Sequence, residues 1–235
     1  CLDYHELLKK KLRALSQYLK AQFPAASIRA AVDTAPILEK DWACEAGIGF
    51  VGLHSLVVHP KLGSRFFLGE LLVSVDFEKL TGVPDRDAYL SALNLRRREQ
   101  GEPLFDAAGS AARCLRCRRC VDACPTGALV GNRTLDARRC LNYWTIETRN
   151  AIPEDIAVNL DGRLFGCDLC QRVCPHNAAI EITPPRLIPL DSVERLDDAA
   201  FRRLFKKTPV FRAHLEGLQR VAQTLMAQNT SSKKK

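Results

Sequence analysis

Eight of the ten cysteines lie close together in the sequence, and their spacing indicates the chemistry they could do. The first four follow the pattern C-x2-C-x2-C-x3-C with a proline after it: Cys114, Cys117, Cys120 and Cys124. Thiolates at such short intervals can bind three corners of an iron–sulfur cubane, while the fourth leads away toward a neighbouring cluster. The spacing therefore predicts 4Fe–4S clusters of the bacterial-ferredoxin kind. A zinc site or a chance match is the alternative.

A second cysteine motif, at Cys167, Cys170 and Cys174, lacks one of the usual four members. Cys140 is the one other cysteine nearby, so we expect it to complete the set. In two-cluster ferredoxins the cysteine before the proline crosses to the other cluster. We therefore predict two interlocked 4Fe–4S clusters, one on Cys114, Cys117, Cys120 and Cys174, the other on Cys124, Cys140, Cys167 and Cys170.

The composition of the chain indicates the cellular compartment and the kinds of partner to expect. Closely spaced metal-binding thiols are typical of a reducing compartment, so we predict a cytoplasmic protein in which Cys1 and Cys44 are free thiols. No apolar run is long enough for a membrane span, and we expect no membrane partner. The net charge of +8 permits a polyanionic partner such as nucleic acid without proving one. Because the chain begins with Cys and not Met, we interpret it as a processed form or a fragment.

The elements that must position these residues follow from the hydrophobic pattern. Leucines at helical spacing predict an amphipathic helix over 4–22, with its leucines on one stripe. A short strand is expected over 28–33. Thr34 could then cap a helix over about 36–46, which Pro36 would begin.

The remaining segments are less periodic. Two β-rich apolar segments, 55–59 and 65–75, predict two strands of a sheet. Residues 82–110 indicate a loop with one short helix, which makes them the best candidate linker. Two closing helices are expected over 198–228, and the polar residues 229–235 predict a disordered tail.

Several strings of residues, most of them outside the cysteine motifs, resemble one family. They are A-V-D-T-A-P-I-L-E at 31–39, A-G-I-G-F-V-G-L-H-S at 46–55, F-F-L-G-E-L-L at 66–72, L-D-A-R-R-C at 135–140, Y-W-T-I-E at 143–147 and F-G-C-D-L-C at 165–170. On these residues the chain resembles epoxyqueuosine reductase, from about Asp3 to Gln219.

The resemblance implies an activity and its cofactors. In that family two 4Fe–4S clusters and a cobalamin reduce the epoxide of epoxyqueuosine, at the wobble position of tRNA, to the alkene of queuosine. The same cofactors are implied here. So are a tRNA partner, an external one-electron donor of the flavodoxin or ferredoxin type, and a monomeric state.

The resemblance also implies site residues. Asp33 falls on the family's proton donor and is a cobalamin contact, and further cobalamin contacts fall on Val57, Leu68 and Asn142. Desolvation over an apolar corrin face would raise the pKa of this carboxyl, as a general acid near neutral pH requires. Without the resemblance, Asp33 would be interpreted as a residue that caps the following turn.

The resemblance further implies an α+β fold with a definite domain order. Residues 1–100 would be the C-terminal part of a cobalamin-binding α/β domain, and 101–183 a bacterial-ferredoxin-like two-cluster domain. Closing helices would occupy 184–228 and pack on the body, before the tail at 229–235. Family members carry a long further N-terminal segment, and a lysine where this chain has Leu53.

Other polar residues near the motifs have competing interpretations. We interpret His54 as structural and not as a cobalt ligand, and His176 as packing against a cluster. Arg138 and Arg139 could meet tRNA phosphates or offset cluster charge. Two rival functions stay open: an electron-transfer iron–sulfur module or inactive remnant, and a reductive dehalogenase, whose leader and tyrosine acid are not seen here.

Overall fold

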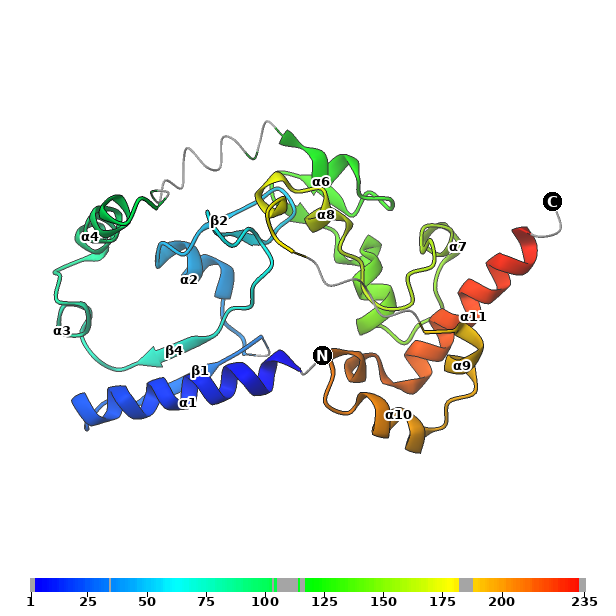
Figure 1. The fold of residues 1–235 in the computed structure, drawn as a ribbon, viewed down its shortest axis with the longest axis horizontal. Helices are drawn as coiled ribbons and strands as arrows, with labels where there is room; N and C mark the ends of the chain where they lie inside the picture. Colours follow the sequence, from blue (N-terminus) through cyan, green and yellow to red (C-terminus); the bar gives the residue numbers. More distant parts are fainter. Residues whose placement is uncertain are drawn as a thin grey trace. The chain divides into compact units, whose positions relative to one another are not determined.

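The computed structural model describes residues 3–33, 35–102, 104, 114, 117–181 and 188–232, with side chains up to residue 229 (Figure 1). The chain divides into two compact units. We call Tyr4–Cys117 together with Pro175–Ile180 the pocket unit. We call Asp3, Arg118–Cys174 and the residues from Glu181 onward the cysteine-rich unit. Helices and strands are mixed in the chain, which confirms the coarse α+β class.

The pocket unit begins with helix α1, Tyr4–Gln22, whose bounds agree with the prediction. It packs on a two-stranded antiparallel sheet of β1, Ile28–Ala31, and β4, Glu70–Val73. Leu12 is buried, and its side chain approaches the bare backbone of Gly69. The predicted single buried stripe is only partly right, because Leu7 and Leu15 are exposed.

A second small sheet pairs β2, Phe50–Val51, with β3, Val57–Val58, and helix α2, Glu39–Glu45, packs against both strands. The two strands predicted over 55–59 and 65–75 therefore do not share a sheet. Each pairs with an earlier strand, and each is shorter than predicted. The predicted helix over 36–46 is likewise shorter, and Thr34 lies outside the described residues.

The predicted linker over 82–110 contains one helix, α4 at Arg86–Glu99, which is longer than the short helix expected there. Helix α3, at Phe77–Thr81, ends just before this segment. Asp85 caps α4, because its Oδ1 accepts a hydrogen bond from the N–H of Ala88 at 2.8 Å. Of the second half, residue 103 and residues 105–110 lie outside the described part.

The cysteine-rich unit is built from short elements around the cysteines. In chain order they are α6 at Arg119–Asp122, β5 at Leu129–Gly131, β6 at Thr134–Leu135, the 3-10 helix η1 at Ala137–Arg139, the π-helix η2 at Tyr143–Glu147, α7 at Glu154–Ala157 and α8 at Leu169–Arg172. Strands β5 and β6 form an antiparallel hairpin. A further 3-10 turn, η3 at Pro175–Asn177, belongs to the pocket unit.

The two closing helices predicted over 198–228 are confirmed as α10 at Asp198–Phe205 and α11 at His214–Ser232. The 3-10 turn η4 at Pro209–Ala213 joins them, and a short helix, α9 at Leu190–Glu194, precedes them. Helix α11 contributes side chains to two hydrophobic clusters. Its Val221 and Leu225 pack with Leu141, and its Leu218 and Ala222 pack with residues of α9 and α10. The predicted disordered tail is wrong up to residue 232, where α11 ends.

In the part of the chain that the structure describes, no helix combines the length and the apolar character that crossing a bilayer requires.

Candidate cofactor sites

Six of the nine described cysteines gather in the cysteine-rich unit, and none of the nine is in a disulfide. Helix α6, which carries the buried Cys120, contacts helix α8, which carries Cys170. In each of these short helices the cysteine is the second residue. The two cysteine motifs therefore meet in this unit.

The electrostatics of these thiols indicate how closely they are grouped. The pKa of Cys170 is raised to about 12, first by burial and then by its thiol neighbours, Cys167, Cys140, Cys120 and Cys124. Burial is also the main cause of the raised pKa of Cys167, to which Cys140 and Cys124 add. Thiols that oppose one another's ionisation need a cationic centre to hold them as thiolates, and the irons of a 4Fe–4S cluster provide one. Thiolate donors in this arrangement fit such a cluster.

The thiols do not converge on one point. In the described part of the chain, no three Cys, His, Asp or Glu side chains are close enough together to bind a single metal ion. A 4Fe–4S cluster does not require such convergence, because each thiolate binds its own iron.

The π-helix η2 and Asn142, the residue before it, hold the backbone at the start of the second motif. The Oδ1 of Asn142 accepts a hydrogen bond from the N–H of Cys167, and Thr145 Oγ1 accepts one from the N–H of Gly166 at 3.1 Å. Gly166 has φ +76°, a conformation that favours glycine. Asn142 therefore shapes a loop that carries a predicted cluster ligand. Its predicted contact with cobalamin stays a prediction.

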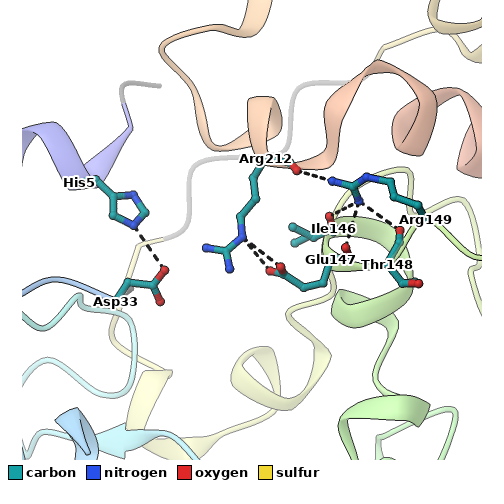
Figure 2. Close-up of polar contacts among 7 residues, drawn as sticks. All are labelled: His5, Asp33, Ile146, Glu147, Thr148, Arg149 and Arg212. Carbon is teal, nitrogen blue, oxygen red and sulfur yellow. Dashed lines mark hydrogen bonds and ion pairs between the residues drawn. The ribbon is translucent and has the colours of Figure 1, made fainter. Parts of the chain in front are cut away.

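Helix η2 is in turn fixed by arginines from its own end and from the closing segment (Figure 2). One guanidinium nitrogen of Arg149 donates to three carbonyls, those of Ile146, Glu147 and Thr148, and the other donates to the carbonyl of Arg212 at 2.8 Å. Arg212 Nε lies 2.9 Å from a carboxylate oxygen of Glu147. These contacts tie η2 to η4, so the loop at Cys167 rests on a braced element.

The first motif begins in the pocket unit, to which Cys114 and Cys117 belong. The backbone N–H of Leu53 donates a hydrogen bond to Cys114 Sγ at 3.1 Å. Backbone donors to cysteine sulfur are typical of iron–sulfur ligation. The division of the eight cysteines into two sets of four stays a prediction.

A pocket in the pocket unit collects three of the four predicted cobalamin residues: Asp33, Val57 and Leu68. Its lining combines apolar and aromatic side chains with a few polar ones. The members that sequence reasoning missed are Tyr4, Glu39, Lys40, Leu56, Ser64, Phe66 and Phe67. Six apolar or aromatic side chains beside four polar ones fit a macrocycle that has an apolar face and a polar rim.

Asp33 stands just after β1, with φ +53°, in the left-handed region that aspartate tolerates better than most residues. Its Oδ2 lies 3.4 Å from Nε2 of His5 on α1 (Figure 2). The imidazole stacks on Tyr4 with ring centroids 4.1 Å apart, and Tyr4 stacks on Phe67 at 3.8 Å. A row of three rings thus ends at the Asp33 carboxylate, and two of these rings, Tyr4 and Phe67, line the pocket.

Glu39, which lines the pocket, lies close to another carboxyl group, that of Glu70. Oε1 of Glu39 and Oε2 of Glu70 are buried and have no hydrogen-bond partner among the described residues. Burial, and then the charge of Glu39, raise the pKa of Glu70. Lys40 Nζ donates to the carbonyl of Ser55 at 2.8 Å, which holds the turn that follows Gly52.

The remaining predicted residues have structural partners. His176 meets Phe50 edge to face at 5.6 Å, and His54 is 4% exposed. Arg138 pairs with Asp136 at 3.0 Å, whereas Arg139 Nε donates to the carbonyl of Thr126 at 2.7 Å. Contacts of these arginines with tRNA stay a prediction.

Comparison with known proteins gives the family. A model of the 4Fe-4S double cluster binding domain matches residues 113–177, and a model described as epoxyqueuosine reductase QueG, DUF1730, matches residues 1–34. The epoxyqueuosine reductase of Gloeobacter violaceus is 34% identical over 244 aligned residues, covering 98% of this chain and 68% of that protein. The chain belongs to the epoxyqueuosine reductase family.

Other members support the assignment. The epoxyqueuosine reductase of Cellulophaga algicola is 33% identical over 227 residues, covering 93% of this chain and 65% of that protein. The solved structure of epoxyqueuosine reductase from Streptococcus thermophilus has a TM-score of 0.76 at 28% identity, covering 97% of this chain and 56% of that one. The chain thus spans about two thirds or less of these two family members. Such relatives favour the reductase over the rival functions left open by the sequence.

Proposed function

We propose that this chain takes part in the reduction of epoxyqueuosine to queuosine in tRNA, as a member of the epoxyqueuosine reductase family. The observation that carries the proposal is the position of Asp33, in the left-handed region at the rim of an apolar pocket and paired with His5. One solved relative is described as an epoxyqueuosine reductase with an epoxyqueuosine-modified tRNA-Tyr stem loop; it has a TM-score of 0.75 at 28% identity. That relative supports tRNA as the partner.

The proposed site would hold two kinds of cofactor. The eight cysteines would hold two 4Fe–4S clusters, and the double-cluster domain match over residues 113–177 supports this. Val57 and Leu68 would pack on a cobalamin, with Asn142 as a further contact. When bound, cobalamin supplies a low-valent metal that can be fed with single electrons and can act on the epoxide carbon.

The residues of the chain would manage protons and water. Converting an epoxide to an alkene consumes two electrons and two protons and releases one water, so the departing oxygen must be protonated. Asp33 would donate a proton to that oxygen. His5 would hold the carboxyl in place, and the rings of Tyr4 and Phe67 would exclude water from that side of the pocket.

Reconstitution tests the proposal directly. The chain is loaded anaerobically with iron, sulfide and cobalamin and supplied with a chemical one-electron reductant. We expect about eight irons and one cobalamin per chain, and conversion of epoxyqueuosine to queuosine in tRNA measured by mass spectrometry. Clusters without bound corrinoid would favour the electron-transfer module instead.

A matched pair of variants tests the assigned acid. Asp33→Asn keeps the size of the side chain but removes its proton, so we expect unchanged iron and cobalamin content and at least about 100-fold slower conversion. Asp41→Asn, on the exposed face of α2, is the control and should leave turnover unchanged. Near-normal turnover in Asp33→Asn would remove Asp33 from the mechanism.

Three further features belong to the proposal. The physiological reductant would be a one-electron donor of the flavodoxin or ferredoxin type, because the clusters accept electrons singly. The chain would act as a monomer in the cytoplasm. Arg138, which is 86% exposed in its side chain, would be available to a phosphate.

A further inference from the structure

His54 occupies the turn between β2 and β3 and is held there from two sides. Its side chain is buried. A Cβ atom built at Gly52 would lie 3.0 Å from His54 Cε1 and 3.2 Å from its Nδ1, so the ring packs directly on bare glycine backbone. The position of the imidazole is therefore defined by close backbone contact, and no side chain could replace Gly52 without moving the ring.

One hydrogen bond decides which ring nitrogen carries the proton. The backbone N–H of Leu56 donates to Nδ1 of His54 at 3.3 Å. A nitrogen that accepts a hydrogen bond cannot itself carry hydrogen, so the neutral imidazole must carry its proton on Nε2. Burial, then the charges of His176 and Lys40, lower the pKa of His54 to about 4, which keeps the ring neutral.

The Nε2–H group faces no acceptor in the described part of the chain. Nε2 is fully buried and has no hydrogen-bond partner there. Buried donors are almost always paired, since an unpaired one loses its bonds to water without replacement. The acceptor is therefore a group that these residues do not supply.

The neighbours of His54 indicate what that acceptor is. The preceding residue, Leu53, gives its N–H to Cys114 Sγ. His176, whose charge acts on His54, follows the predicted ligand Cys174 by two residues. Both neighbours thus lead to cysteines predicted to hold the same cluster.

We propose that the Nε2–H of His54 donates a hydrogen bond to a sulfur of the 4Fe–4S cluster that Cys114 ligates, and thereby raises the reduction potential of that cluster. A donor on sulfur stabilises the reduced state, which carries one more negative charge. The inference rests on the proposed ligation by Cys114. It assigns to His54 a positioning and tuning role and no role in binding cobalt.

Two substitutions at the same position separate the two ring nitrogens. His54→Asn keeps an acceptor near the place of Nδ1 and loses the distant donor, whereas His54→Gln keeps a donor near the place of Nε2. The readout is the midpoint potential of each cluster in the reconstituted protein, from redox titrations followed by electron paramagnetic resonance. We expect His54→Asn to shift the reduction equilibrium of one cluster at least tenfold toward the oxidised state, which is 59 mV for one electron. His54→Gln should lie close to the parent.

A neighbouring histidine provides the control. His59 Nδ1 accepts hydrogen bonds from the N–H groups of Lys61 and Leu62, both at 3.1 Å, and Asn could replace it as acceptor. His59→Asn should leave both cluster potentials unchanged. Unchanged potentials in His54→Asn, at full iron content, would overturn the proposal, as would a change confined to the cobalamin spectrum.

A second measurement covers a variant that loses its cluster. In protein with 15N-labelled histidine and the substitution His176→Phe, pulsed resonance on the reduced clusters should detect weak coupling to one histidine nitrogen. Absence of that coupling would overturn the proposal. A parent chain that takes up no iron would instead contradict the proposed function itself.

Discussion

Asn177 holds Ser64 by two hydrogen bonds, across 113 residues of sequence. The N–H of Ser64 donates to Asn177 Oδ1 at 2.7 Å, and Asn177 Nδ2 donates back to Ser64 Oγ at 3.0 Å. Both residues are buried. Ser64 lines the pocket that contains Asp33, and Asn177 stands three residues after Cys174. This pair of bonds thus joins the segment that follows Cys174 to the pocket wall, within the pocket unit.

Replacing Asn177 should destabilise the protein. Asn177→Ala leaves the buried N–H of Ser64 without its acceptor, and we expect the free energy of unfolding to fall by about 1–3 kcal/mol. Urea denaturation followed by circular dichroism measures it. Asn159→Ala is the control, because Asn159 donates to one carbonyl at an exposed position. Equal stability of the two variants would show that the Ser64 pair contributes little.

Cys140 should be indispensable to one cluster only. The thiol of Cys140 lies near those of Cys167 and Cys170 in the cysteine-rich unit. Serine is a poor ligand for such a soft metal site. We expect Cys140→Ser to bind about half the parental iron after reconstitution, measured by colorimetric iron analysis. Cys44→Ser should keep the full amount. An unchanged iron count in Cys140→Ser would exclude it as a ligand.

His5 should affect turnover without affecting the binding of substrate. The imidazole lies 3.4 Å from the Asp33 carboxylate, so its loss frees a carboxyl that the reaction needs in one place. We expect His5→Phe to lower kcat about tenfold with KM nearly unchanged, and to alter the dependence of kcat on pH. His5→Gln, which can still donate to Asp33, should recover part of the loss.

A variant on the same helix controls for damage to α1. Lys9→Gln changes an exposed side chain one turn further on and should leave both kinetic constants unchanged. If His5→Phe lowered kcat with the same pH profile as the parent, His5 would be a purely structural residue.

Glu70 should make the protein less stable as the pH rises. The pKa of Glu70 in the fold is raised above its ordinary 4.5, so around and above that pH the folded state binds more protons than the unfolded state. The free energy of unfolding must then fall as the pH increases through this window, and it stays reduced above it. We expect Glu70→Gln to flatten that slope and to raise the unfolding midpoint at pH 7. Glu78→Gln, at an exposed position of α3, should do neither.

Local signals in the sequence predicted some of this structure well. The leucine periodicity set the bounds of α1, because an amphipathic helix carries its pattern within its own residues. The cysteine spacing identified the iron–sulfur region for the same reason. Helix α4 is longer than the short helix predicted within 82–110, although Asp85, its capping residue, was a readable signal ahead of a run without Gly or Pro.

Long-range pairings were beyond such signals. The strands predicted over 55–59 and 65–75 share no sheet, because β4 pairs with β1 in the register Ala31 to Glu70. That register depends on contacts between residues far apart in the sequence. It pairs Glu70 with Ala31, which stands two residues before Asp33. The contacts of Ser64 with Asn177 and of Leu53 with Cys114 are also long-range. The sequence around each of these residues does not indicate which partner it will contact.

The Ser64–Asn177 pair also sets an order of events during synthesis. Residues 175–180 belong to the pocket unit, although they are translated after the whole segment 118–174 of the cysteine-rich unit. The ribosome must therefore synthesise the second cysteine motif before Ser64 can meet Asn177. Contacts of such high sequence separation form slowly, so this part of the pocket wall can close only after both cysteine motifs have left the ribosome.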